Sequence, residues 1–115
     1  MDGAWDIAHD AGTGPIGAQL WQVTQSGCDV SLKAMSADGS AATLFAGVGA
    51  AGDAGFWVAW TLTDGPCRVD GRVAVDVTAD MLDGTVSEAR SHRGAGECPG
   101  AGLGIVTARV HGTRR

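Results

Sequence analysis

Apolar and polar positions alternate along much of this chain, most regularly between Cys67 and Thr78. The apolar face of that segment holds Val69, Val73, Val75 and Val77, and the opposite face holds Arg68, Asp70, Arg72 and Asp76. A helix would scatter these charges around its circumference, whereas a half-buried antiparallel strand separates them in this way. The pattern therefore predicts a strand over Cys67–Thr78.

The same period of two predicts further strands, separated by turn signals rich in Gly, Asp, Ser and Pro. They are expected at Ala4–Asp10, Ile16–Gln25, Cys28–Met35, Ala41–Gly49, Gly55–Thr63, Met81–His92 and Gly102–His111. Sequential strands with short hairpin loops favour closure, because closure removes the exposed edges of a sheet. We expect one all-β domain over residues 1–115, an antiparallel up-and-down β-barrel of about eight strands, with a two-sheet β-sandwich as the alternative.

The alternation also indicates which large side chains face the interior. Strand parity places Trp60 inward, and Trp57 faces outward, where it could mark an interface. The expected interior set is Trp5, Trp21, Phe56, Val58 and Trp60. These residues either line a pocket for one small ligand or simply fill the core of a barrel that is poor in Leu and Ile.

Polar candidates come from the same parity rule. Continued along Met81–His92, it places Glu88 and Arg90 inward, and His9 shares a face with Ile7. In an apolar cavity Glu88 and His9 could transfer protons, and Arg90 could hold a carboxylate. If the protein is an enzyme, His9, Glu88 and Arg90 are therefore its expected catalytic residues. Alternatively Glu88 and Arg90 form a rim ion pair, or the strand frays after Val86 and both lie in water.

Charge and composition exclude several function classes. The net charge is −5 and Lys33 is the sole lysine, so no basic surface for nucleic acid is expected. No apolar run approaches the roughly 18 residues of a membrane-spanning helix. The histidines have no metal-ligand spacing, and Gly12–Gly17 follows no βα unit, so neither a metal nor a cofactor is expected. Homo-oligomers could form through the barrel walls.

The three cysteines are relevant to the cellular compartment, because disulfides persist in oxidising compartments. Cys67 and Cys98 lie in turn-like contexts near strand ends, where a disulfide is one of two open alternatives, and Cys28 is expected to be a small buried residue. The first residues, Met1–Trp5, do not read as a signal peptide. We expect an extracellular or periplasmic protein whose signal has been removed, with a cytoplasmic protein as the alternative, in which all thiols would stay reduced.

Two short segments resemble known barrel families. Trp21–Gly27 (WQVTQSG) and Met81–Thr85 (MLDGT) are similar to small bacterial secreted β-barrel proteins, and Gly55–Trp60 (GFWVAW) resembles a strand of the avidins. The resemblance implies an avidin- or lipocalin-like meander barrel, with Trp60 matching the Trp that lines the biotin pocket. The chain contains no Tyr and no Asn, which avidin-type sites use to hold biotin, so the resemblance does not extend to that ligand.

Together these observations predict a binding module for one small hydrophobic or amphipathic molecule inside a barrel. The enzymatic alternative is a cofactor-free cyclase or isomerase that folds a polyketide-like substrate in the cavity, with His9 or Glu88 as general acid–base. A further alternative is a structural or surface-interaction protein with a filled core.

Overall fold

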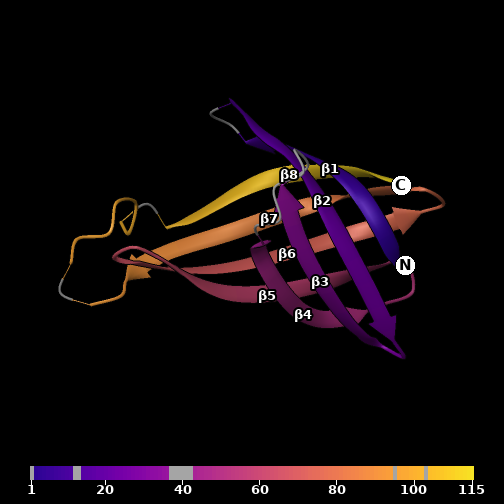
Figure 1. The fold of residues 1–115 in the computed structure, drawn as a ribbon, viewed down its shortest axis with the longest axis horizontal. Coiled ribbons are helices and arrows are strands. Elements are labelled where there is room, and N and C mark those ends of the chain that lie inside the picture. Colours follow the sequence, from indigo (N-terminus) through magenta and orange to yellow (C-terminus); the bar gives the residue numbers. More distant parts are fainter. Residues whose placement is uncertain (1, 12–13, 37–42, 95, 103) are drawn as a thin grey trace.

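A closed antiparallel barrel forms the whole of the described structure, a computed structural model (Figure 1). It describes residues 2–11, 14–36, 43–94, 96–102 and 104–115, and only the backbone of residues 9–11 and 14–18. The strands, in chain order, are β1 (Gly3–Ala11), β2 (Gly14–Ser26), β3 (Asp29–Ser36), β4 (Thr43–Ala51), β5 (Gly55–Asp64), β6 (Cys67–Thr78), β7 (Met81–His92) and β8 (Ile105–Arg114).

Each strand pairs with its sequence neighbours, and β1 pairs with β8 to close the barrel. This confirms the up-and-down barrel rather than the sandwich. Every strand has a neighbour on both sides, which limits the exposed sheet edges, although β4 and β5 pair only over Val48–Ala51 and Phe56–Ala59. The predicted bounds of β6 and β7 match the observed ones.

The prediction for the last strand was wrong by three residues at each end. It was expected at Gly102–His111, but β8 begins at Ile105 and continues to Arg114. Gly104 has a φ of +70°, a left-handed conformation that suits the residue leading into a strand rather than one inside it. At the other end Arg114 pairs with Trp5 of β1, and this pairing completes the closure.

The fourth strand, expected at Ala41–Gly49, is observed at Thr43–Ala51. Residues 41 and 42 lie outside the described residues. The strand extends past its predicted end because Ala51 pairs with Phe56 of β5 and its N–H donates to the Cys28 carbonyl oxygen at 2.8 Å.

The barrel interior is filled by alternate residues of every strand. The fully buried side chains include Trp5, Trp21, Ile7, Leu82 and Val73. The barrel is elongated, because β5 to β8 run on beyond β1 to β4 at one end (Figure 1). That end carries the β5–β6 turn and the β7–β8 connection, and we call it the mouth.

Candidate ligand-binding site at the mouth of the barrel

The predicted ligand-binding set faces the interior. Relative exposures are 0% for Trp5, Trp21 and Val58, 4% for Phe56 and 5% for Trp60. The inward parity predicted for them is therefore confirmed, and Trp57 points outward with 40% exposure. That these residues bind a ligand stays a prediction.

Phe45, which the sequence analysis missed, joins these rings into one packed cluster. Its ring stacks on Trp60 at a centroid distance of 4.0 Å, and Trp21 meets it edge-on at 6.1 Å. Phe45 follows the apolar Leu44, so neither face of β4 looks polar and parity is hard to assign from sequence. Its alternation with Gly47 and Gly49 was the available signal, because both glycines share its inward face.

Gly71 makes room for the Trp60 indole against the barrel wall. A Cβ atom at Gly71 would lie 2.1 Å from Trp60 Cε2 and 2.5 Å from Nε1. The indole is thus held between the Phe45 ring on one side and the backbone of β6 on the other. Its nitrogen-bearing edge lies over Gly71 of β6.

The indole N–H of Trp60 is buried and has no hydrogen-bond partner among the described residues. Trp21 provides a direct contrast, since its Nε1 donates to Oε1 of the buried Gln19 at 3.0 Å. An unsatisfied buried donor costs about 1–3 kcal/mol, and such groups are rare in folded proteins. Trp60 Nε1 is therefore a buried donor whose hydrogen bond no acceptor of the described chain takes.

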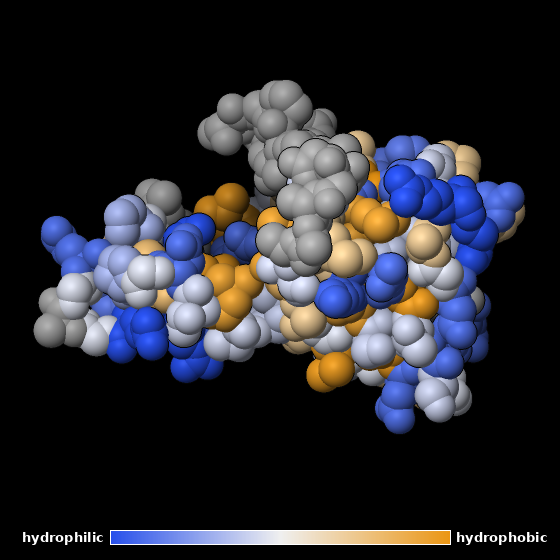
Figure 2. All heavy atoms as spheres, in the orientation of Figure 1, coloured by the Kyte–Doolittle hydropathy of each residue, from blue (hydrophilic) through white to orange (hydrophobic). Residues whose placement is uncertain are grey.

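Between Trp60 and the mouth, the inward side chains of β7 and β8 become exposed to solvent. On the inward face of β7, Val86 is 8% exposed and the next inward residue, Glu88, is half-buried. On β8, Val110 is 2% exposed, whereas Val106 is 58% exposed on the same inward face. Hydrophobic surface is visible on the narrower, projecting part of the molecule (Figure 2). On β7 and β8 the packed core thus ends near the row of Trp60, whereas on β6 Val69, one inward position further along, stays buried at 2% exposure.

Glu88 and Arg90 lie on the inward face at the mouth, as strand parity predicted, but the alternative of an ion pair between them was wrong, because Arg90 binds Asp64 instead. The strand does not fray after Val86, because β7 stays paired with β6 and β8 well beyond it. Glu88 lies opposite Gly71 in the β6–β7 register, in the row that begins with Trp60. Arg90 binds Asp64 through a 3.1 Å ion pair.

For His9 the structure describes the backbone alone. Its Cα is paired with Val110 of β8, whose side chain is inward and buried. The side chain of His9 lies outside the described residues. Catalytic roles for His9, Glu88 and Arg90 therefore stay predictions.

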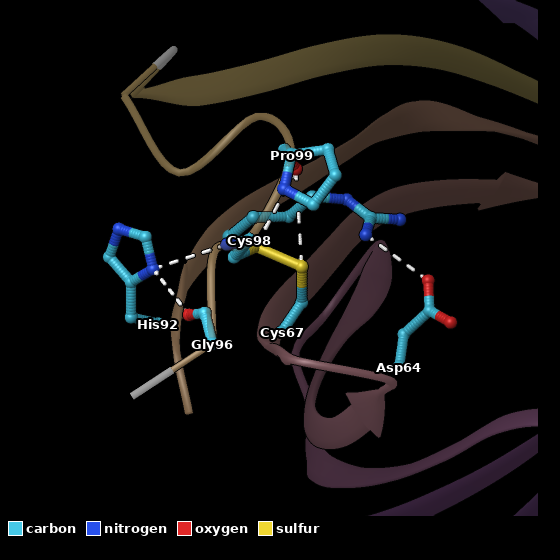
Figure 3. The surroundings of a disulfide bond; sticks show 7 residues. Asp64, Cys67, His92, Gly96, Cys98 and Pro99 are labelled. Atoms are coloured by element: carbon cyan, nitrogen blue, oxygen red, sulfur yellow. Dashed lines mark hydrogen bonds and ion pairs between the residues drawn. A yellow bond between two sulfur atoms is a disulfide. The ribbon is translucent and has the colours of Figure 1, made fainter. Parts of the chain in front are cut away.

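A disulfide between Cys67 and Cys98 ties the β7–β8 connection to the start of β6 (Figure 3). Both cysteines are buried, at 1% and 5% exposure. Nδ1 of His92 accepts a hydrogen bond from the Cys98 backbone N–H at 3.2 Å, which adds a second tie. These contacts fix the segment beside the mouth and settle the open alternative for the cysteines in favour of the disulfide.

The prediction that Cys28 is buried was wrong, because the residue is exposed. It lies in the β2–β3 turn just after Gly27, whose φ is +60°. A tight turn at that place moves Cys28 off the strand, where alternation would have buried it.

The outer wall carries shallow hollows of its own. One, of about 460 Å³, runs beside Trp57 and Val48 and includes the hydroxyl-bearing Thr24 and Ser31. Another, of about 530 Å³, follows the line where β4 and β5 separate and is lined by Trp60 as well as by Val48, which borders both hollows. These hollows are the competing places for a ligand, so a test of the mouth needs an outer-wall control.

Within the described residues there is no helix of the length and apolarity needed to cross a bilayer. In the same part of the chain, no three His, Cys, Asp or Glu side chains come close enough together to hold a metal ion.

No protein family matches the sequence, and no curated protein is similar to it. Among solved structures, the chain is similar to one described as "EF1p2_mFAP2b bound to DFHBI", with a TM-score of 0.66 and 14% sequence identity. The similarity covers 99% of this chain and 93% of that one. At this identity the likeness shows the eight-stranded barrel fold.

Proposed function

We propose that this protein binds one small hydrophobic or amphipathic molecule at the mouth of its barrel. The apolar part of the molecule would lie against the inward faces of β5 to β8, beside Leu62 and Val106. A polar acceptor on the molecule would take the hydrogen bond of Trp60 Nε1. In this proposal Phe45, Trp21 and Trp5 support the Trp60 ring from within the core.

The observation that carries the proposal is the unpartnered N–H of Trp60, a side chain that is only 5% exposed. In a structural protein with a filled core, a buried N–H without a hydrogen-bond partner would only lower the stability of the fold. The donor lies at the boundary between packed and solvent-exposed interior. That boundary is where a small molecule could reach it without displacing the core.

The barrel of similar fold was solved with DFHBI bound, which supports small-molecule binding by this architecture at the level of fold. Interior sites of eight-stranded barrels hold at most one small ligand. The Cys67–Cys98 disulfide supports an oxidising compartment, and we propose that the protein works outside the cytoplasm.

A neutral environment-sensitive dye, N-pentyl dansylamide, provides the test, because its sulfonamide oxygens can accept the Trp60 N–H. Dansyl emission should rise and saturate on titration with the protein, with energy transfer from Trp. Replacing Trp60 by Phe keeps an aromatic ring and removes the donor. The affinity should fall by about fivefold, since a net hydrogen bond contributes about 1 kcal/mol.

Trp57→Phe is the matched control, because Trp57 lies on the outer wall beside the 460 Å³ hollow. It should leave the affinity unchanged. Val48→Ala is a second control, because Val48 lines both outer-wall hollows and Trp60 lines one of them. The proposal is wrong if no saturable binding occurs, if Trp57→Phe weakens binding while Trp60→Phe does not, or if Val48→Ala weakens binding as much as Trp60→Phe does.

A further inference from the structure

The mouth contains a carboxylate without a countercharge. Glu88 is half-buried on the inward face of β7, and no cationic side chain of the described chain forms an ion pair with it. Its register neighbour on β6 is Gly71, over which the nitrogen-bearing edge of Trp60 lies. A free acceptor and a free donor therefore occupy neighbouring positions in the same row.

The other ionisable side chains of β7 at the mouth are already engaged. Arg90 is bound to Asp64 at 3.1 Å, which makes that pair neutral overall. His92 uses Nδ1 to accept the N–H of Cys98, which ties its ring to the connection. Arg93 and Glu97 carry opposite charges and are exposed in the β7–β8 connection, so the unpaired charge on the described inward face of the mouth is that of Glu88.

The basic residues of the adjacent strands face away from the mouth. On β6, Arg68 binds Asp70 at 3.3 Å, and Arg72 lies over the outward Trp57 ring at 4.8 Å. On β8, Arg109 is exposed and pairs with Thr85, which alternates with the inward Val86. None of these three cations shares the inward face with Glu88.

Resting on the proposed function, we infer that the polar end of the ligand is cationic, and that the ligand is an amphipathic amine with an oxygen acceptor close to its apolar part. The ammonium group would face the Glu88 carboxylate. The oxygen would accept the Trp60 N–H, and the apolar part would cover the exposed inward face of β8. An anionic head group would meet Glu88 with like charge and would be disfavoured.

Three dansyl probes that differ only at the end of a five-carbon tether test this charge preference. Dansylcadaverine ends in an ammonium group, N-pentyl dansylamide is neutral, and dansyl-6-aminohexanoate ends in a carboxylate. Wild-type protein should bind them in that order of decreasing affinity. The step from the ammonium to the neutral probe should be about threefold to tenfold, as expected for a partly solvated ion pair.

Glu88→Gln should remove the preference for the ammonium probe and leave the neutral probe unaffected, because the side chain keeps its shape and loses its charge. Glu97→Gln is the matched control, since Glu97 is the only other glutamate and is exposed in the β7–β8 connection. It makes the net charge of −5 less negative by one, as Glu88→Gln does, and should preserve the ranking. Added salt should reduce the ranking in wild type.

The possible failures are distinguishable. If the neutral probe does not bind saturably, the proposed function and this inference both fail. If the neutral probe binds but the carboxylate probe binds as well as the ammonium probe or better, the inference fails and the proposed function stands. If Glu97→Gln abolishes the ranking as fully as Glu88→Gln, the preference comes from net charge and the inference is again wrong.

Discussion

A methyl group added at Gly71 tests whether the Trp60 indole lies against the backbone of β6. The Cβ of Gly71→Ala would lie 2.1 Å from Cε2 and 2.3 Å from Cζ2 of the indole, against ordinary contacts of 3.4 Å or more. The ring would have to move by about 1 Å or more, but Phe45 is stacked on its other face at 4.0 Å. Both rings must therefore shift together. Overpacking of this kind costs about 1–3 kcal/mol.

Urea denaturation followed by Trp fluorescence measures this cost. Gly71→Ala should lower the free energy of unfolding by about 1–3 kcal/mol, with an unchanged slope against urea. Gly94→Ala is the control, because a Cβ there meets nothing within 4 Å, and it should stay within about 0.5 kcal/mol of wild type.

A double-mutant cycle ties the cost to the indole itself. In a Trp60→Phe background the shorter ring leaves space over Gly71, so Gly71→Ala should cost at least about 1 kcal/mol less than in wild type. A Gly71→Ala variant as stable as Gly94→Ala, or a cost that is the same in both backgrounds, would refute the packing argument.

Further outcomes follow from the cysteines and the outer wall. Replacing Cys67 and Cys98 by Ala should lower the free energy of unfolding by about 3–4 kcal/mol, because the bond closes a loop with a sequence separation of 31; an unchanged urea midpoint would contradict this. Native protein should react with a thiol reagent at Cys28 alone, and mass spectrometry that finds label on another cysteine would be inconsistent with the disulfide. Arg72→Ala should cost no more than about 1 kcal/mol in thermal unfolding, since its stacking on Trp57 is exposed; a larger loss would show that the outer wall supports the core.

The sequence predicted the barrel because strand alternation is a local property. The valines of β6 mark one face, and that parity carried correctly through β7 to Glu88 and Arg90. Turn residues predicted the strand ends less well where a contact with a distant part of the chain fixes the connecting segment. The start of β8 depends on a connection held by Cys98, and the exposure of Cys28 depends on a turn that begins at Gly27.

The details of the site depend on contacts between strands that are distant in sequence. Nothing local to Phe45 indicates that it stacks on Trp60, since β4 and β5 diverge where the two residues lie. Likewise, the fit of Trp60 over Gly71 arises from the register of β5 against β6. Whether a buried N–H finds a partner is decided by the whole surrounding structure, so the unpartnered donor could be found only in three dimensions.

The indole N–H signals of ¹⁵N-labelled protein test the central claim most directly, because each of the four tryptophans contributes one cross-peak. Trp60→Phe and Trp57→Phe assign the two signals that matter. On titration with dansylcadaverine, the Trp60 Nε1–H cross-peak should move downfield as it gains an acceptor, while that of Trp57 stays in place. A Trp60 signal that does not move while the probe binds, or a shift confined to Trp57, would contradict ligand binding at the mouth.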